Sequence, residues 1–125
     1  MLRYICIILS LNLGLVGSEY FYYHHDERVK LTPKKMESHS RWLMKSSNGR
    51  DVILTNKIIV KTDDKNLLDR YLQEYNASIL KELKENVFLV IVQDVNQTLD
   101  ITNMLHNKEG IIYVYPDLIR KRVLR

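Results

Sequence analysis

One stretch decides the fold: VFLVIV at residues 87–92 is apolar at every position. A strand with one face in water alternates apolar and polar residues, whereas a strand covered on both faces is apolar throughout. The stretch therefore predicts a central strand of a β-sheet. Residues 84–86 (KEN) form a turn before it, and residues 78–83 form the strand that pairs with it across that turn.

Upstream of this strand pair, the pattern predicts a first strand and a helix. Residues 52–54 and 57–61 are rich in β-branched residues, which favour strands. Asp63 or Asp64 can cap the helix that follows, and Asn76 can end it in a left-handed conformation. One face of this helix has apolar or aromatic side chains spaced i, i+3, i+4 and i+7, namely Leu68, Tyr71, Leu72 and Tyr75.

Downstream of the strand pair, the pattern predicts a second helix and a last strand. Residues 98–106 carry an apolar helical face, and the polar stretch 107–110 breaks the helix. Residues 111–115 then form a strand, which Pro116 stops because proline cannot donate to a sheet ladder.

The predicted elements follow the order β-α-β-β-α-β. This is the order of a ferredoxin-like α+β fold, in which an antiparallel sheet has two helices on one face. We expect this fold over residues 51–117, preceded by a short β-hairpin arm. Its core is expected to contain Ile59, Leu68, Leu72, Leu89, Ile91, Leu105 and Val114.

Residues 1–18 are predicted to be a cleavable secretory signal. A positive start with Arg3 precedes a mostly apolar run at residues 4–16, and Gly17-Ser18 supplies small residues for cleavage. The run is too short for a stable membrane span. We therefore expect a secreted or periplasmic protein with no stable membrane span after signal cleavage. An uncleaved N-terminal anchor is the alternative.

Residues 19–50 are expected to form a Tyr-rich hairpin arm and a polar linker. Two β-prone runs, YFYY at 20–23 and VKLT at 29–32, flank a polar turn and predict a β-hairpin that Pro33 ends. Residues 33–50 are basic and polar with little periodicity, so a linker or loop is predicted there.

Composition and charge exclude several classes of protein. The chain is 46% hydrophobic and 27% charged, which is typical of a globular protein. Loss of Arg3 with the signal lowers the formal net charge from +4 to +3, too balanced a value to indicate nucleic-acid binding. The one cysteine, Cys6, lies in the signal, so the mature chain has no disulfide or thiolate metal site.

Neither a catalytic site nor a metal or cofactor site is predicted. His24 and His25 are adjacent on a strand, so their side chains point to opposite faces and cannot readily bind one ion. A structural zinc needs about four convergent ligands, and His39 and His106 have no useful spacing to the first two. Ser78 lacks the glycine elbow and the nearby base of a nucleophilic serine.

Three stretches of the folded region resemble the N-terminal pro-domain of subtilisin-like serine proteases. They are the opening strand at 57–61, the strand pair within 77–92, and KEGIIYVYPD at 108–117, in which a glycine and aliphatic residues lead into a short strand ending at a proline. The Tyr-rich segment through Pro33 is similar to the leader of some secreted members.

The resemblance implies a partner and a binding mode. Pro-domains of this family pack their sheet on the protease, lay their C-terminal tail in the substrate cleft, and act as folding chaperones and inhibitors. A preorganised sheet lowers the ordering cost of such a tail, which gains main-chain hydrogen bonds in the cleft. The implied partner is a subtilisin-like serine protease, in cis or in trans. The implied protease-binding tail is Leu118, Ile119, Arg120, Lys121, Arg122, Val123, Leu124 and Arg125.

Two details follow from this assignment. Arg125 would occupy a specificity pocket that accepts a basic residue. Deleting the tail is expected to leave the domain folded, because residues 118–125 follow the last predicted strand.

The chain departs from the family pattern in one respect. No Asp, His and Ser stand in the sequence contexts of the family's catalytic residues, so we do not expect an enzyme. The chain is then either a stand-alone inhibitor or a non-catalytic N-terminal fragment of a protease precursor. The alternative is a secreted structural or interaction domain that shares only the fold and uses its Tyr-rich hairpin as a contact surface.

Overall fold

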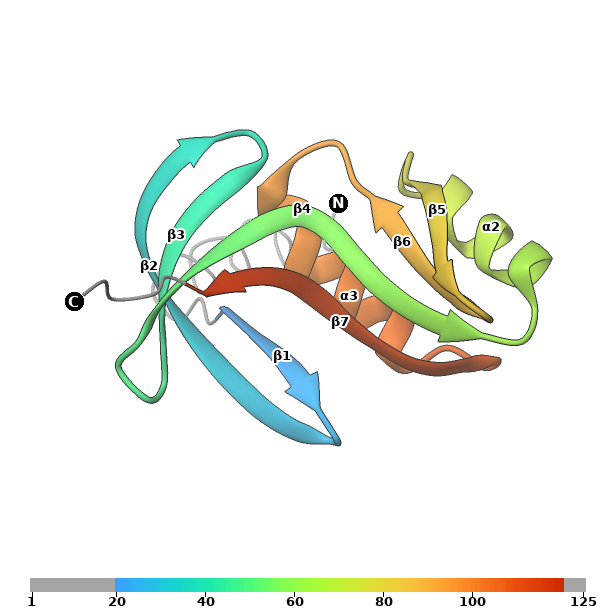
Figure 1. Cartoon of the computed structure of the whole chain (residues 1–125), viewed down its shortest axis with the longest axis horizontal. Helices are drawn as coiled ribbons and strands as arrows, with labels where there is room; N and C mark the ends of the chain where they lie inside the picture. Colours follow the sequence, from blue (N-terminus) through green and yellow to red (C-terminus); the bar gives the residue numbers. More distant parts are fainter. Residues whose placement is uncertain (1–19, 121–125) are drawn as a thin grey trace, which may run out of the picture.

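The computed structural model describes residues 20–120, which form an antiparallel β-sheet with two α-helices and a short 3₁₀-helix (Figure 1). The predicted signal at residues 1–18 lies outside the described residues. In chain order the elements are β1 (Tyr20–His24), β2 (Glu27–Ser38), β3 (Arg41–Ser46), β4 (Asp51–Thr62), α2 (Lys65–Gln73), β5 (Ser78–Lys84), β6 (Val87–Ile91), η1 (Val95–Gln97), α3 (Thr98–His106) and β7 (Ile111–Arg120).

The long strand β4 organises the sheet. Its first half, from Asp51 to Thr55, pairs with β3, and its second half, from Lys57 to Lys61, pairs with β6. Its opposite edge pairs with β7 along most of its length. The strand order is β1-β2-β3-β4-β6-β5 with β7 beside β4, seven strands within the described residues. Figure 1 shows β4 and β7 crossing the molecule together, with β2 and β3 curling away at one end and β5 and β6 at the other.

The predicted fold class, a ferredoxin-like sheet preceded by a hairpin arm, is wrong. Strands β1, β2 and β3 are not an appended arm, because they continue the same sheet from β4 and curl it into a half-barrel of mostly antiparallel strands. Residues 33–50, predicted to be a linker, supply half of β2 and all of β3. The outer half of β2 is exposed at every position from Thr32 to Ser38, so its side chains show no alternation, although its backbone pairs with β3.

The N-terminal hairpin forms where it was expected, but its second strand is longer. β1 and β2 turn at His25 and Asp26, which both have a positive φ, as a tight hairpin turn requires. β2 does not end at Pro33. A shift of register between Pro33 and Lys35 accommodates the proline, since a bulge leaves a residue without a ladder partner.

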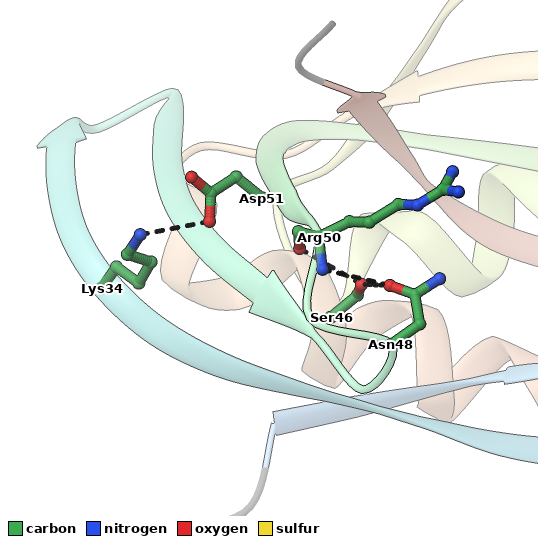
Figure 2. Close-up of polar contacts among 5 residues, drawn as sticks. All are labelled: Lys34, Ser46, Asn48, Arg50 and Asp51. Carbon is green, nitrogen blue, oxygen red and sulfur yellow. Dashed lines mark hydrogen bonds and ion pairs between the residues drawn. The ribbon is translucent and has the colours of Figure 1, made fainter. Parts of the chain in front are cut away.

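Polar contacts close the turn between β3 and β4 (Figure 2). The Ser46 hydroxyl donates to the Asn48 side chain, and the same Asn48 oxygen accepts from the Arg50 backbone N–H at 3.2 Å. Beside the turn, the Lys34 ammonium lies 3.1 Å from the Asp51 carboxylate and links β2 to β4. These contacts explain why a serine- and glycine-containing stretch forms a defined turn rather than a free linker.

Two hydrophobic cores lie on one face of the sheet. The main core joins sheet residues to both helices and contains Ile58, Val60, Leu68, Leu72, Ala77, Phe88, Val90, Val92, Ile101, Leu105 and Val114. The second core joins β2, β3 and β4 to η1 and α3 and contains Leu31, Met44, Val52, Leu54, Val95 and Leu99. Strand β4 contributes to both cores, so it couples the two ends of the molecule.

Four of the seven predicted core residues are confirmed in the main core, namely Leu68, Leu72, Leu105 and Val114. The prediction is wrong for Ile59 and Ile91, which are only partly buried. Leu89 is buried but belongs to neither core. The reason is that odd-numbered residues of β4 and β6 point away from the helices, and only the even-numbered ones reach the cores.

The helices start and stop where local signals predicted. The Asp64 carboxylate accepts the Leu67 backbone N–H at 3.0 Å and caps α2, and Asn76 has the left-handed φ of 55° that ends the segment. Gly110 has a φ of 87°, and a Cβ there would lie 2.4 Å from the Leu67 side chain, so this turn requires glycine. Between residues 20 and 120, no helix combines the length and apolar character needed to cross a membrane.

Candidate protein-binding surface

The face of the sheet turned away from the helices, which we name the outer face, carries rows of apolar side chains. Ile59 lies in the middle of one row, with Leu89 beside it on β6 and Tyr115 beside it on β7. All three have odd numbers and alternate with residues of the main core, so they share the face opposite the helices. Tyr115 is 37% exposed.

Further rows continue this surface along β4. Lys61 lies between Val87 and Tyr113, and Lys57 lies beside Ile91. At the other end of β4 the outer face holds a third apolar row, made of Leu43, Ile53 and Ile119. Of these, Ile119 is 42% exposed.

Lysines flank the apolar rows of the outer face. Lys57 and Lys61 come from β4, and the pairing of β5 with β6 adds Lys81 opposite Leu89 and Lys84 opposite Val87. A lysine stem can lie along a neighbouring apolar group while its ammonium group stays in water. The outer face therefore combines apolar rows with a positive border.

The aromatic side of the outer face has a distinct electrostatic environment. Tyr113 and Tyr115 stack with ring centroids 5.6 Å apart, and the Lys61 ammonium lies 6.0 Å from the Tyr113 ring centroid. Burial, together with the neighbouring Tyr113 and Asp117, raises the pKa of the Tyr115 hydroxyl. Tyr115 thus stays protonated at neutral pH and can donate a hydrogen bond to a partner.

The structure divides the predicted protease-binding tail. Leu118, Ile119 and Arg120 are the last residues of β7 and pair with Leu54, Ile53 and Val52 of β4. The strand therefore does not stop at Pro116, contrary to the sequence prediction, and Leu118 packs against the second core. The remaining tail residues Lys121, Arg122, Val123, Leu124 and Arg125 lie outside the described residues.

The Tyr-rich hairpin forms one wall of a groove of about 960 Å³, and β7 forms the opposite wall. Tyr22, Tyr23 and His24 line the β1 side, while Tyr113 and Tyr115 line the β7 side. The outer edge of β1 and the outer edge of β7 pair with no strand of the described chain. Unpaired strand edges present main-chain donors and acceptors in a regular row.

Histidines gather at one end of the groove without forming a metal site. His106 of α3 stacks on Tyr23 with a centroid separation of 4.4 Å, and its Nε2 lies 3.5 Å from the Asp26 carboxylate. The His24 and His25 rings contact each other edge to face. Among residues 20–120, no group of three or more His, Cys, Asp or Glu side chains could hold a metal ion.

Sequence reasoning missed most of the outer face. Leu43 was not assigned to a strand, because residues 33–50 were taken for a linker. Ile53 was assigned to a strand, but not to an exposed face. The apolar odd-numbered positions of β6 were the available signal, and they were interpreted as a second buried face.

Comparison with known proteins identifies no relative, since no protein-family model, curated protein or solved structure matches this chain.

Proposed function

We propose that the protein is an exported, non-catalytic binding module that docks on a subtilisin-like serine protease and acts as its inhibitor or folding chaperone. The observation that carries the proposal is the outer face, which no described helix covers and on which Tyr115 and Ile119 are 37% and 42% exposed. Exposed apolar side chains gathered on one face are typical of a protein-binding surface. In the proposal, the protease covers the outer face.

The chemistry of the outer face supports a protein partner. At its centre the partly buried Ile59 and the exposed Tyr115 offer apolar area and one hydroxyl donor, and Lys57 and Lys61 lie beside them. Apolar centres with polar rims are typical of protein interfaces, and tyrosine is enriched there. The positive border suits a partner surface that carries carboxylates.

The course of β7 supports the second half of the binding mode. β7 is extended up to Arg120, and Lys121–Arg125 follow it directly. An extended segment anchored at one end by a folded sheet loses less freedom on entering a substrate cleft, and it gains main-chain hydrogen bonds there by strand addition. In this proposal Arg125 fills the primary specificity pocket, so the target accepts basic residues.

The test is competitive inhibition of a subtilisin-like protease that cleaves after basic residues, using residues 19–125. We expect the full mature chain to compete with a peptide substrate, and deletion of residues 121–125 to abolish competition without changing the circular dichroism spectrum or the melting temperature. Arg125→Asp should weaken inhibition far more than Lys65→Asp, an exposed control on α2. Equal inhibition by the full and the shortened chain would exclude cleft binding.

A separate variant tests docking by the outer face. Tyr115→Ala should weaken inhibition about tenfold or more, as expected for loss of a central interface tyrosine. Met36→Ala removes an apolar side chain from β2 that is 45% exposed, more than Tyr115, and should leave inhibition unchanged. Absence of inhibition by every form of the protein would refute the protease partner. Turnover of peptide or ester substrates by the purified chain alone would refute the non-catalytic assignment.

A second candidate function is binding of an extended segment from another protein in the groove between β1 and β7. The two facing edges without strand partners favour it, because an added strand would pair with them. Hydrogen exchange measured with and without a bound partner separates the candidates. Protection of amides along β1 and β7 supports groove binding, whereas protection confined to the outer face and the tail supports the first proposal.

A further inference from the structure

A second pocket lies between the N-terminal strands, η1 and α3. Its volume is about 620 Å³. It is separate from the outer face, because its walls come from the side of the sheet that packs on η1 and α3. The lining residues are Tyr20, Phe21, Trp42, Leu54, Val95, Asn96, Gln97, Leu99, Asp100 and Asn103.

One part of the pocket is apolar and aromatic. Leu54, Val95 and Leu99 are buried members of the second core and form an apolar base. Tyr20 and Trp42 pack on the same core and meet edge to face, with ring centroids 5.1 Å apart. Such a base and wall suit an alkyl chain, and the ring faces of tyrosine and tryptophan attract cations.

The other part of the pocket is polar. Asp100 and Asn103 are three residues apart on α3 and so share one face of the helix. Asp100 is the one acidic side chain among the lining residues, and no basic side chain of the described chain is paired with it. Asp100 lies at the exposed rim of the pocket. The neighbouring protein partly desolvates its carboxyl, which raises the pKa of that group.

Asn103 forms the pocket wall next to Asp100. Its Nδ2 donates to the Phe21 carbonyl at 2.8 Å, which fixes the orientation of the amide. Its Oδ1 is buried and accepts no hydrogen bond from any described residue. Because this oxygen has almost no accessible surface, a ligand in the pocket does not contact it, and Asn103 contributes to the shape of the wall rather than to ligand binding.

We propose that this pocket binds a basic side chain, with the alkyl stem on Leu54, Val95 and Leu99 and the ammonium or guanidinium group between Trp42 and Asp100. The ligand class follows from the wall chemistry: the Asp100 carboxylate and the ring faces select a cationic donor, and the apolar base selects an alkyl stem. An anionic ligand would be repelled by Asp100. This inference goes beyond the proposed function and does not rest on it.

Two sources can supply the same cation. One is the basic segment Lys121–Arg125, which follows Arg120 in this chain. The other is an arginine or lysine of a second polypeptide. Both present an alkyl stem with a positive tip, and deletion of residues 121–125 distinguishes them.

The experiment uses the fluorescence of Trp42, the one tryptophan of the sequence, to follow titration of residues 19–125 with N-acetyl-arginine methylamide. The matched probe is the citrulline analogue, which has the same shape without the charge. We expect saturable binding of the arginine probe and at least about tenfold weaker binding of the citrulline probe, the loss of a charge-assisted contact.

Two variants locate the site. Asp100→Asn should reduce affinity for the arginine probe about tenfold while the chain stays folded, whereas Asp69→Asn on α2 should leave it unchanged.

If the chain's own tail occupies the pocket, deleting residues 121–125 will tighten binding of the probe. If a second polypeptide is the source, the deletion will have no effect. Equal binding of both probes, unchanged affinity of Asp100→Asn, or no binding by either chain length overturns the proposal.

Discussion

Asp100 is expected to bind a cation in the proposed pocket and to lower the stability of the folded chain. It stands in the first turn of α3, where a negative charge is normally favourable, yet burial raises the pKa of its carboxyl. Because the folded state then holds the proton more tightly than the unfolded state, stability falls as pH rises through the folded pKa. The ionised carboxylate therefore destabilises the chain at neutral pH.

The corresponding prediction concerns pH. Asp100→Asn should be more stable than wild type at pH 7, because the variant never ionises, and the difference should vanish below the ordinary carboxyl pKa of about 3.9. Urea denaturation at pH 7 and at the lowest pH where both chains fold measures it. An advantage of the variant that grows on acidification would contradict the assigned direction. The same variant is expected to lose cation binding, so stability and binding should change in opposite directions.

At the scale of elements, β7 is one strand from Ile111 to Arg120 with an irregularity in the middle. The ladder with β4 shifts between Leu54 and Ile58, and the Thr55 hydroxyl donates to the Asp117 carbonyl at 2.7 Å within that irregularity. Pro116 is tolerated because it lies at this point, where a bulge or irregularity accommodates a residue without an N–H. The strand therefore continues past its proline.

This continuity predicts different results for two deletions. Removing residues 121–125 should leave the melting temperature unchanged, because β7 and both cores remain intact. Removing residues 118–125 also removes three pairs with β4 and the contact of Leu118 with the second core, and should lower the melting temperature by at least about 5 °C. Thermal unfolding followed by circular dichroism compares them. Equal melting temperatures would show that Leu118–Arg120 do not contribute to the sheet.

At the scale of the whole molecule, the two cores are joined through β4. The main core takes Ile58 and Val60 from its second half, and the second core takes Val52 and Leu54 from its first half. Met44 and Leu31 are as deeply buried in the second core as Leu72 is in the main core. The N-terminal strands are thus part of one packed unit.

We therefore predict a single cooperative unfolding transition that responds to both cores. Met44→Ala and Leu72→Ala should each destabilise this transition by about 2–5 kcal/mol, because each leaves a cavity in a closed core. Leu80→Ala, at a position that is 50% exposed, should change it by less than about 0.5 kcal/mol. Urea denaturation followed by Trp42 fluorescence and by circular dichroism provides the measurement. A separate early transition of the N-terminal strands in Met44→Ala would contradict a shared unit.

Local signals in the sequence determined the elements from β4 to the start of β7. The spacing of Leu68 and Leu72, the cap at Asp64 and the left-handed stop at Asn76 depend on neighbours within a few residues, so the chain specifies them without reference to the rest of the fold. The apolar run of β6 and the burial of Leu105 and Val114 likewise followed from the local sequence pattern.

Only the tertiary structure decided how these elements join the N-terminal strands. Trp42 pairs with Leu54, Asn103 reaches the Phe21 carbonyl, and the pocket with Asp100 exists only once these segments meet. Strand pairing uses backbone groups that every residue shares, so exposed strands such as the outer half of β2 carry no readable side-chain pattern. The apolar run of β6 likewise indicated burial without saying what covers each face. In the structure both helices pack on one face, and Val87 and Leu89 are nevertheless buried on the other.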